Sequence, residues 1–306
     1  MVVIGESGEI EVLRMISGKL VKTFKVSKSG KLCVAAFYEE DMMFYSNDET
    51  IHKIVLLDDS GQPTISKKGK LLTDPQANHQ ETTFLRSAGN NIRGLVIDTV
   101  RRKLVFCDYE NIYEINFNNS GFRKLVVGNG GDSLAIFGNQ LYFSDSTRIF
   151  RTTITSTNTT ISCNLQKGSS CQKIFSNGKD YVKSMMVEKY NKKLYFRLGN
   201  NVIAVVDINL PNSAYPVQTP RVVISDTRYT YGFGGIAVHG NRLIWNRVSA
   251  SFNQRFLGLM NKDLNFVSKK HIYKFENQRK KVHNPAAQLD VFEHLFSTNP
   301  RPTNKG

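Results

Sequence analysis

The sequence predicts an all-β fold, a six-bladed β-propeller with four-stranded blades, whose last blade is shared by the N-terminal and C-terminal segments. Three observations predict it. A pattern of short apolar runs joined by polar turns occurs five times, an additional apolar run follows each copy, and the two chain ends together supply a sixth copy. Short strands at regular spacing, separated by polar turns, are typical of propeller blades packed around a central channel.

The repeat is clearest in the segment SLAIFGNQLYFSDSTRIFR, residues 133–151. Its runs LAIF and LYF are separated by Gly138 and Asn139, and an aromatic-Ser-Asp end leads into RIFR. The other copies begin at Cys33, Gly94, Ser184 and Gly235. The apolar runs that follow the copies predict the outermost strands, at residues 70–72, 124–127, 173–175, 221–224 and 272–275.

These copies divide the single predicted domain, residues 1–306, into blades. Blades one to five are expected at residues 31–90, 91–128, 131–177, 181–226 and 231–276. Residues 1–26 predict three strands without an innermost strand, residues 286–295 predict a lone innermost strand, and residues 296–306 form a tail. Pairing the two ends in one sheet would hold them in place and leave no long exposed edge.

The repeat motifs resemble those of the YWTD family, the six-bladed propellers of the low-density lipoprotein receptor and its relatives. The match is best for LYFSD at residues 141–145 and LVFCD at residues 104–108. MFYSN and LIWNR are weaker matches, and LYFRL retains only the strand. Leu198 and Arg247 replace the signature Asp, so the resemblance implies a divergent member in which that residue's hydrogen bonds are missing or rewired in blades four and five.

The repeated side chains are expected to build blades and to do no chemistry. Aromatic pairs on the second strands, such as Tyr142 with Phe143, would fill the spaces between blades. Asp108 and Asp145 would accept hydrogen bonds from backbone N–H groups of their turns. GNGGD at residues 128–132 precedes a predicted strand and is interpreted as a blade-joining loop.

No catalytic residue, metal site or cofactor is predicted. The six His residues lack metal-binding spacing, and among the predicted innermost strands only Asp290 provides an acidic group. The chain is therefore expected to be a non-enzymatic binding protein. Two alternatives stay open, a small-molecule-binding propeller of the yellow and royal-jelly type that uses the central channel, and a calcium-dependent propeller hydrolase.

The charge balance and the cysteines indicate the environment. Lys and Arg number 41 against 26 Asp and Glu, a net charge of +15, which favours polyanions such as glycosaminoglycan. We expect no specific nucleic-acid binding, and no run approaches the roughly 18 apolar residues of a membrane span.

Cys163 and Cys171 are expected to form a disulfide, whereas the state of Cys33 and Cys107 is left open.

A secreted or extracellular domain is expected. The first ten residues, MVVIGESGEI, lack the pattern of a signal peptide, so the sequence reads as a mature domain or an intracellular chain. The disulfide and two glycosylation sequons, at Asn118 and Asn158, favour the extracellular interpretation.

The predicted topology places the loops on two faces. Connections between first and second strands and between third and fourth strands lie on the bottom face, where basic residues are expected to bind a polyanion: Lys67, Lys68, Lys70, Arg101, Arg102, Lys103, Lys192, Lys193, Lys269 and Lys270. The remaining connections lie on the top face, where aromatic and charged residues are expected to bind a protein partner: Tyr109, Glu110, Arg148, Tyr181, Tyr229, Tyr231, Phe252 and Arg255. The partner is expected on the top face between blades four and six.

Overall fold

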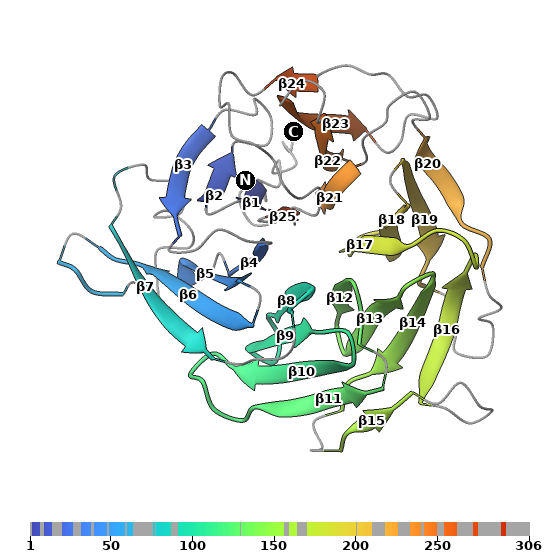
Figure 1. Ribbon diagram of the computed structural model, residues 1–306, viewed down its shortest axis with the longest axis horizontal. Helices are drawn as coiled ribbons and strands as arrows, with labels where there is room; N and C mark the ends of the chain where they lie inside the picture. The colour runs from blue at the N-terminus through green and yellow to red at the C-terminus, as the bar shows by residue number, and fades with distance from the viewer. Residues whose placement is uncertain are drawn as a thin grey trace, which may run out of the picture.

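The computed structural model describes residues 2–6, 9–13, 20–26, 32–37, 40–47, 49–58, 60–63, 76, 78–86, 91–128, 130–155, 159–163, 170–199, 201–209, 218–225, 233–239, 242–249, 254–261, 272–274 and 289–291. Within these ranges the strands form six sheets, five with four strands and one with five. Figure 1 shows the sheets side by side in a ring, each running outward from the centre. The all-β, propeller-like arrangement predicted from the repeats is confirmed.

Numbered in chain order, sheets 1 and 2 contain the following strands. Sheet 1 runs outward through β4 (Leu32–Phe37), β5 (Met42–Asn47), β6 (Thr50–Leu56) and β7 (His79–Leu85). Sheet 2 runs through β8 (Gly94–Asp98), β9 (Lys103–Cys107), β10 (Asn111–Asn116) and β11 (Arg123–Val127), and ends on β15 (Ile161–Ser162).

Sheets 3 to 5 repeat the four-stranded order. Sheet 3 contains β12 (Leu134–Phe137), β13 (Gln140–Asp145), β14 (Arg148–Thr153) and β16 (Cys171–Ser176). Sheet 4 contains β17 (Val182–Glu188), β18 (Lys193–Leu198), β19 (Val202–Asp207) and β20 (Arg221–Ser225). Sheet 5 contains β21 (Phe233–His239), β22 (Arg242–Ser249), β23 (Gln254–Asn261) and β24 (Ile272–Lys274).

Sheet 6 joins the two ends of the chain. Its strands are β25 (Leu289–Val291), β1 (Val2–Glu6), β2 (Glu9–Leu13) and β3 (Leu20–Lys25). β25 pairs antiparallel with β1, with Val291 opposite Val2. The first residues therefore share a sheet with a segment from the far end of the sequence (Figure 1).

The core lies between neighbouring sheets. On β13, Tyr142 packs in a cluster with Val187 and Phe196 of sheet 4, whereas its neighbour Phe143 packs with Val105 of sheet 2. Successive side chains of a strand point to opposite faces, so one aromatic pair serves two interfaces. These rings are buried, which confirms that the repeated aromatic pairs fill the spaces between sheets.

The outer strand of sheet 1 does not lie where the sequence predicted it. The apolar run at residues 70–72 is outside the described residues, and the strand that pairs with β6 is β7. In β7 only Phe84 is buried, and most of the remaining side chains are half-buried or exposed. An outermost strand has little core to face, so apolar content was a poor guide to its position.

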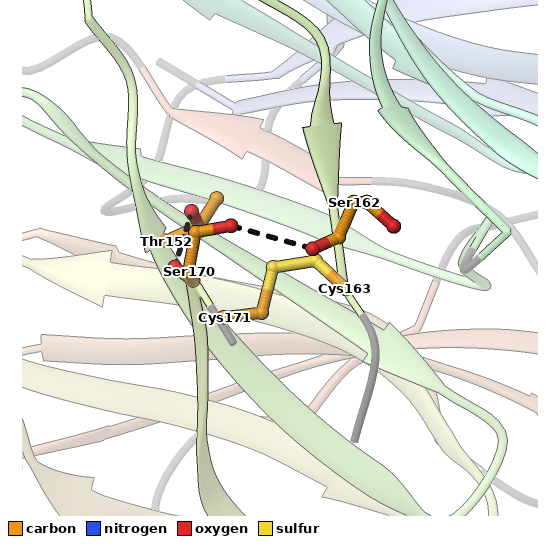
Figure 2. Close-up of a disulfide and its surroundings, with 5 residues drawn as sticks. All are labelled: Thr152, Ser162, Cys163, Ser170 and Cys171. Carbon is orange, nitrogen blue, oxygen red and sulfur yellow. Dashed lines mark hydrogen bonds between the residues drawn. A yellow bond between two sulfur atoms is a disulfide. The ribbon is translucent and has the colours of Figure 1, made fainter. Parts of the chain in front are cut away.

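The predicted disulfide between Cys163 and Cys171 is present, with a Cα–Cα distance of 5.1 Å. Cys171 begins β16 of sheet 3, and Cys163 directly follows β15. β15 pairs in parallel with β11, which makes it a fifth strand on sheet 2. The disulfide therefore connects two sheets as well as closing a loop (Figure 2).

Hydrogen bonds also connect the chain segments around this disulfide, between sheets 2 and 3. The Thr152 hydroxyl donates to the Ser170 carbonyl at 2.9 Å, and the Ser170 hydroxyl donates to the Ser162 carbonyl at 3.3 Å (Figure 2). Cys163 and Cys171 are both buried in the apolar cluster between sheets 2 and 3. No pattern in the sequence indicates β15, because a strand of two residues is too short to show periodicity.

Candidate binding surfaces

The turn between β9 and β10 presents Tyr109 on the top face. One oxygen of the Asp108 carboxylate accepts hydrogen bonds from the backbone N–H groups of Glu110 and Asn111, at 2.8 and 2.7 Å. Its other oxygen accepts a hydrogen bond from the Tyr113 hydroxyl at 3.0 Å. This confirms Asp108 as the acceptor that locks its turn. Tyr109, at the tip of that turn, is 60% exposed.

The Tyr113 hydroxyl is a reliable donor to Asp108. Burial is the main reason that the pKa of Tyr113 is raised, and the carboxylate of Asp108 raises it further, although the hydrogen bond from Asn111 acts in the opposite direction. A raised pKa keeps the hydroxyl protonated at neutral pH. The turn that carries Tyr109 is therefore fixed by three hydrogen bonds to one carboxylate.

The loop that joins sheets 2 and 3 packs closely against this turn. The N–H group of Gly131 donates to the Asp108 carbonyl at 3.0 Å. A Cβ atom at Gly130 would lie 2.2 to 2.3 Å from backbone atoms of residues 108–110. The loop lies between β11 and β12, which are in different sheets, so the interpretation of GNGGD as a blade-joining loop is correct.

Substituting Gly130 by Ala should lower the free energy of unfolding by about 2 kcal/mol, because the methyl group would overlap backbone that cannot rotate away. Gly128→Ala is the control. Its Cβ would meet nothing within 4 Å, and only the positive φ of 78° opposes it, at about 1 kcal/mol. Denaturant unfolding of the two variants measures the difference. Equal losses would show that the close approach at Gly130 is not a constraint.

A charged cluster surrounds Tyr109. The Arg93 guanidinium carbon lies 3.1 Å from the centroid of the Tyr109 ring, and the same guanidinium forms an ion pair with Asp132. Arg93 precedes β8 and Asp132 precedes β12, so connecting segments from two neighbouring sheets meet over this turn. We call Arg93, Tyr109 and Asp132 the Tyr109 cluster. A cation over a ring stabilises the ring's orientation at an exposed site.

The other predicted top-face residues fall into three groups: exposed, half-buried, and those whose side chains are not described. Glu110 and Tyr181 are exposed, the latter 53%, and the Lys183 ammonium lies 5.8 Å from the Tyr181 ring centroid. Arg148 is half-buried and pairs with Asp145 across the β13–β14 turn. Asp145 thus locks its turn through an ion pair, whereas a backbone acceptor role was predicted. Tyr229, Tyr231 and Phe252 lie outside the described residues, and for Arg255 only the backbone, in β23, is described.

Arg93, Asp132 and Lys183 were missed by sequence reasoning. Each lies beside the start of a first strand, where the apolar run is the stronger sequence pattern. A charged residue precedes both β8 and β12 in the sequence, and this repetition is the pattern that could have identified such residues as candidates.

Arg197 is a buried cation on β18. Burial lowers the pKa of Arg197 to about 10, and Asp132 acts in the opposite direction. Aligned by the repeat, Arg197 occupies the position of Ser46, Cys107 and Ser144 in the other second strands. It stays protonated at neutral pH. Within the described residues no group of three or more His, Cys, Asp or Glu side chains could hold a metal ion.

On the bottom face, the predicted cations of sheet 2 are already paired with carboxylates. Glu114 is fully buried, and its carboxylate accepts hydrogen bonds from Arg101, Lys103 and Arg123. The Arg101 guanidinium also donates to Asp98 at 2.6 Å. We call these residues the Glu114 network, and their contacts link β9, β10 and β11 of sheet 2.

The remaining polyanion candidates are mixed. Arg102 is exposed but pairs with Glu40. Lys192 is exposed and Lys193 is half-buried. The rest lie outside the described residues: Lys67, Lys68, Lys70, Lys269 and Lys270. Binding of a polyanion stays a prediction.

The two sequons differ in what the structure describes. Asn118 is exposed in the turn between β10 and β11, and its side-chain oxygen accepts a hydrogen bond from the Ser120 hydroxyl at 2.7 Å. Asn158 lies outside the described residues. Glycosylation at both sites stays a prediction.

Cys33 and Cys107 are buried thiols in β4 and β9. No helix in the described part of the chain is long and apolar enough to cross a membrane.

Comparisons with known proteins support the fold. No family model and no curated protein matches the chain. A chain from the crystal structure of a nidogen/laminin complex has a TM-score of 0.65 at 11% sequence identity, and the match covers 95% of this chain and 98% of that one. A computationally designed protein, Ika8, has a TM-score of 0.44 at 10% identity, with 87% and 69% of the two chains covered. The nidogen/laminin likeness spans nearly the whole of both chains and supports the propeller-like architecture.

Proposed function

We propose that the chain is a six-bladed YWTD-type propeller that binds a protein partner outside the cell and performs no chemistry itself. The binding surface is the top face around the Tyr109 cluster. The observation that carries the proposal is an aromatic ring held at 60% exposure on a turn fixed by three hydrogen bonds to Asp108. A rigid exposed aromatic ring loses little conformational entropy on binding, which suits it to an interface.

Two further observations support the proposal. The chain of similar fold comes from a complex of nidogen and laminin, so a fold of this kind occurs in a protein–protein complex. The disulfide between Cys163 and Cys171 fits an oxidising, extracellular environment. Tyr109 lies between β9 and β10 of sheet 2, and Tyr181 is exposed just before β17 of sheet 4. These described residues support a surface centred on the Tyr109 cluster, and we centre the proposal there and not on blades four to six.

The test compares two exposed tyrosines on opposite faces. Wild-type protein, Tyr109→Ala and Tyr190→Ala are immobilised and used to capture proteins from extracellular matrix extract, with mass spectrometry as the readout. Tyr190 is 83% exposed on the turn between β17 and β18, so it is a matched control. Wild type and Tyr190→Ala should retain the same partner, and Tyr109→Ala should lose it.

The affinity of the purified partner then gives the size of the effect. Tyr109→Ala should weaken binding at least tenfold, since a central aromatic residue typically contributes about 2 kcal/mol. Thermal unfolding should be unchanged, because the ring is mostly in solvent. Equal binding by all three proteins would overturn the proposal. A ligand in the channel would be insensitive to Tyr109→Ala, since Tyr109 follows a second strand and not an innermost one.

A further inference from the structure

Two equivalent turns on the bottom face expose apolar side chains at their tips. One joins β8 to β9 and the other joins β17 to β18. Val100 in the first is 77% exposed, and Tyr190 in the second is 83% exposed. Each turn ends in a basic residue with left-handed backbone, Arg102 with φ 55° and Lys192 with φ 49°. The two turns therefore share length, conformation and an apolar tip.

Buried carboxylates hold both turns in shape. Asp98 accepts hydrogen bonds from the backbone N–H groups of Val100 and Arg101, at 3.0 and 2.9 Å. Glu188 accepts a hydrogen bond from the N–H group of Asn191 at 3.2 Å. Asp98 and Glu188 are both buried at the base of their turns. The apolar tips are thus presented on preformed turns and are not exposed by a loose loop.

The topology brings the two tips to one end of the ring. Both turns connect a first strand to a second strand, and β8 and β17 each contact β12, which lies between them. The turn that follows β12 has only Gly138 and Asn139 between the strands. Because the turn between them is shorter, Val100 and Tyr190 are the prominent side chains of this part of the bottom face. We call the bottom-face turns that follow β8, β12 and β17 this sector.

Basic residues flank the tips. Lys189 and Lys192 are exposed on either side of Tyr190. Arg102, which ends the turn of Val100, is exposed and pairs with Glu40. The acidic residues at these turns, Asp98 and Glu188, are buried, so the surface that meets a partner carries cations around apolar tips. Apolar side chains that enter the interface, with Lys and Arg at headgroup level, are the combination that anionic lipid favours.

We propose that this sector of the bottom face docks on an anionic phospholipid bilayer, with Tyr190 and Val100 entering the interface and Lys189 and Lys192 at the lipid phosphates. A sulfated polymer would bind the cations through charge, but such binding would not explain the exposed apolar side chains at the tips. The proposal goes beyond binding a protein partner at the Tyr109 cluster, because it uses the opposite face and would leave that cluster accessible.

The test is co-sedimentation with large vesicles of phosphatidylcholine alone or mixed with phosphatidylserine. Wild type should bind the mixed vesicles and not the neutral ones. The double variant Val100→Ser/Tyr190→Ser should bind at least about fivefold more weakly. Lys189→Gln/Lys192→Gln should weaken binding by a similar factor and remove most of its salt dependence. Thermal unfolding confirms that each variant is folded.

The control variant Tyr109→Ser/Tyr181→Ser removes two exposed tyrosines from the top face and should bind vesicles like wild type. On a heparin column, the apolar double variant should elute at the wild-type salt concentration. Absence of wild-type binding to mixed vesicles would overturn the proposal. Unchanged vesicle binding by the apolar variant, with loss only in the charge variant, would also overturn it and would indicate a polyanion site.

Discussion

Replacing Glu114 by Gln should lower the free energy of unfolding by about 3 kcal/mol, because breaking a buried ion pair leaves uncompensated charge. The Glu114 carboxylate is fully buried and accepts hydrogen bonds from Arg101, Lys103 and Arg123. The three cations keep 20%, 23% and 16% of their side-chain surface exposed, so water can partly solvate them once the carboxylate is lost. The loss should therefore fall at the lower end of the range for buried pairs.

Chemical denaturation of the two proteins measures this loss. Glu110→Gln is the matched control, since Glu110 is an exposed carboxylate in the same sheet, and its substitution should change stability by less than about 0.5 kcal/mol. If Glu114→Gln and Glu110→Gln unfolded at the same denaturant concentration, the Glu114 network would have no structural role.

The same carboxylate should make the protein acid-sensitive. Burial by itself would raise the pKa of Glu114, but hydrogen bonds from Lys103 and Arg123, together with the charge of Arg101, outweigh burial and lower it. The stability that this ionised group contributes is complete above its unfolded-state pKa, near the ordinary glutamate pKa of 4.5, and is lost as pH falls through the lower folded-state pKa. Glu114→Gln should flatten the acid side of a plot of melting temperature against pH. An unchanged slope would contradict the lowered pKa.

Removing the disulfide with Cys163→Ala/Cys171→Ala should lower the free energy of unfolding by about 2–3 kcal/mol, mainly by freeing the unfolded chain. The effect should be local as well as global, because Cys163 holds β15 against β11 of sheet 2 while Cys171 belongs to sheet 3. Amide hydrogen exchange should show faster exchange in residues 159–163 and in β11 than in β19 of sheet 4.

The double variant avoids a leftover thiol that could pair with Cys33 or Cys107. Wild type in a reducing agent should reproduce the result, which separates loss of the disulfide from any effect of the alanine side chains. A uniform change in exchange across all sheets would show that the disulfide does not act as a local connection between sheets 2 and 3.

The sequence by itself determined the repeating sheet. The alternation of apolar residues with polar turns specified which strands pair and which rings are buried, because a β-strand places successive side chains on opposite faces. Phe143 and Tyr142 lie on opposite faces of sheet 3, as that rule requires, toward sheets 2 and 4. The spacing of Cys163 and Cys171 predicted their disulfide for a similarly local reason.

Only the tertiary structure decided where charge and exposure lie. Arg101 and Lys103 read as a basic surface in the sequence, yet they pair with Glu114, eleven or more residues away and on another strand. The Tyr109 cluster combines Arg93, Tyr109 and Asp132 from three connecting segments, and β15 joins a sheet that its sequence neighbours do not belong to. The Glu114 contacts depend on how strands pair within sheet 2, whereas the Tyr109 cluster and β15 depend on how sheets pack around the ring. Periodicity within a strand contains no information about them, because the pairing partner of a charged side chain is set by distance in space and not along the chain.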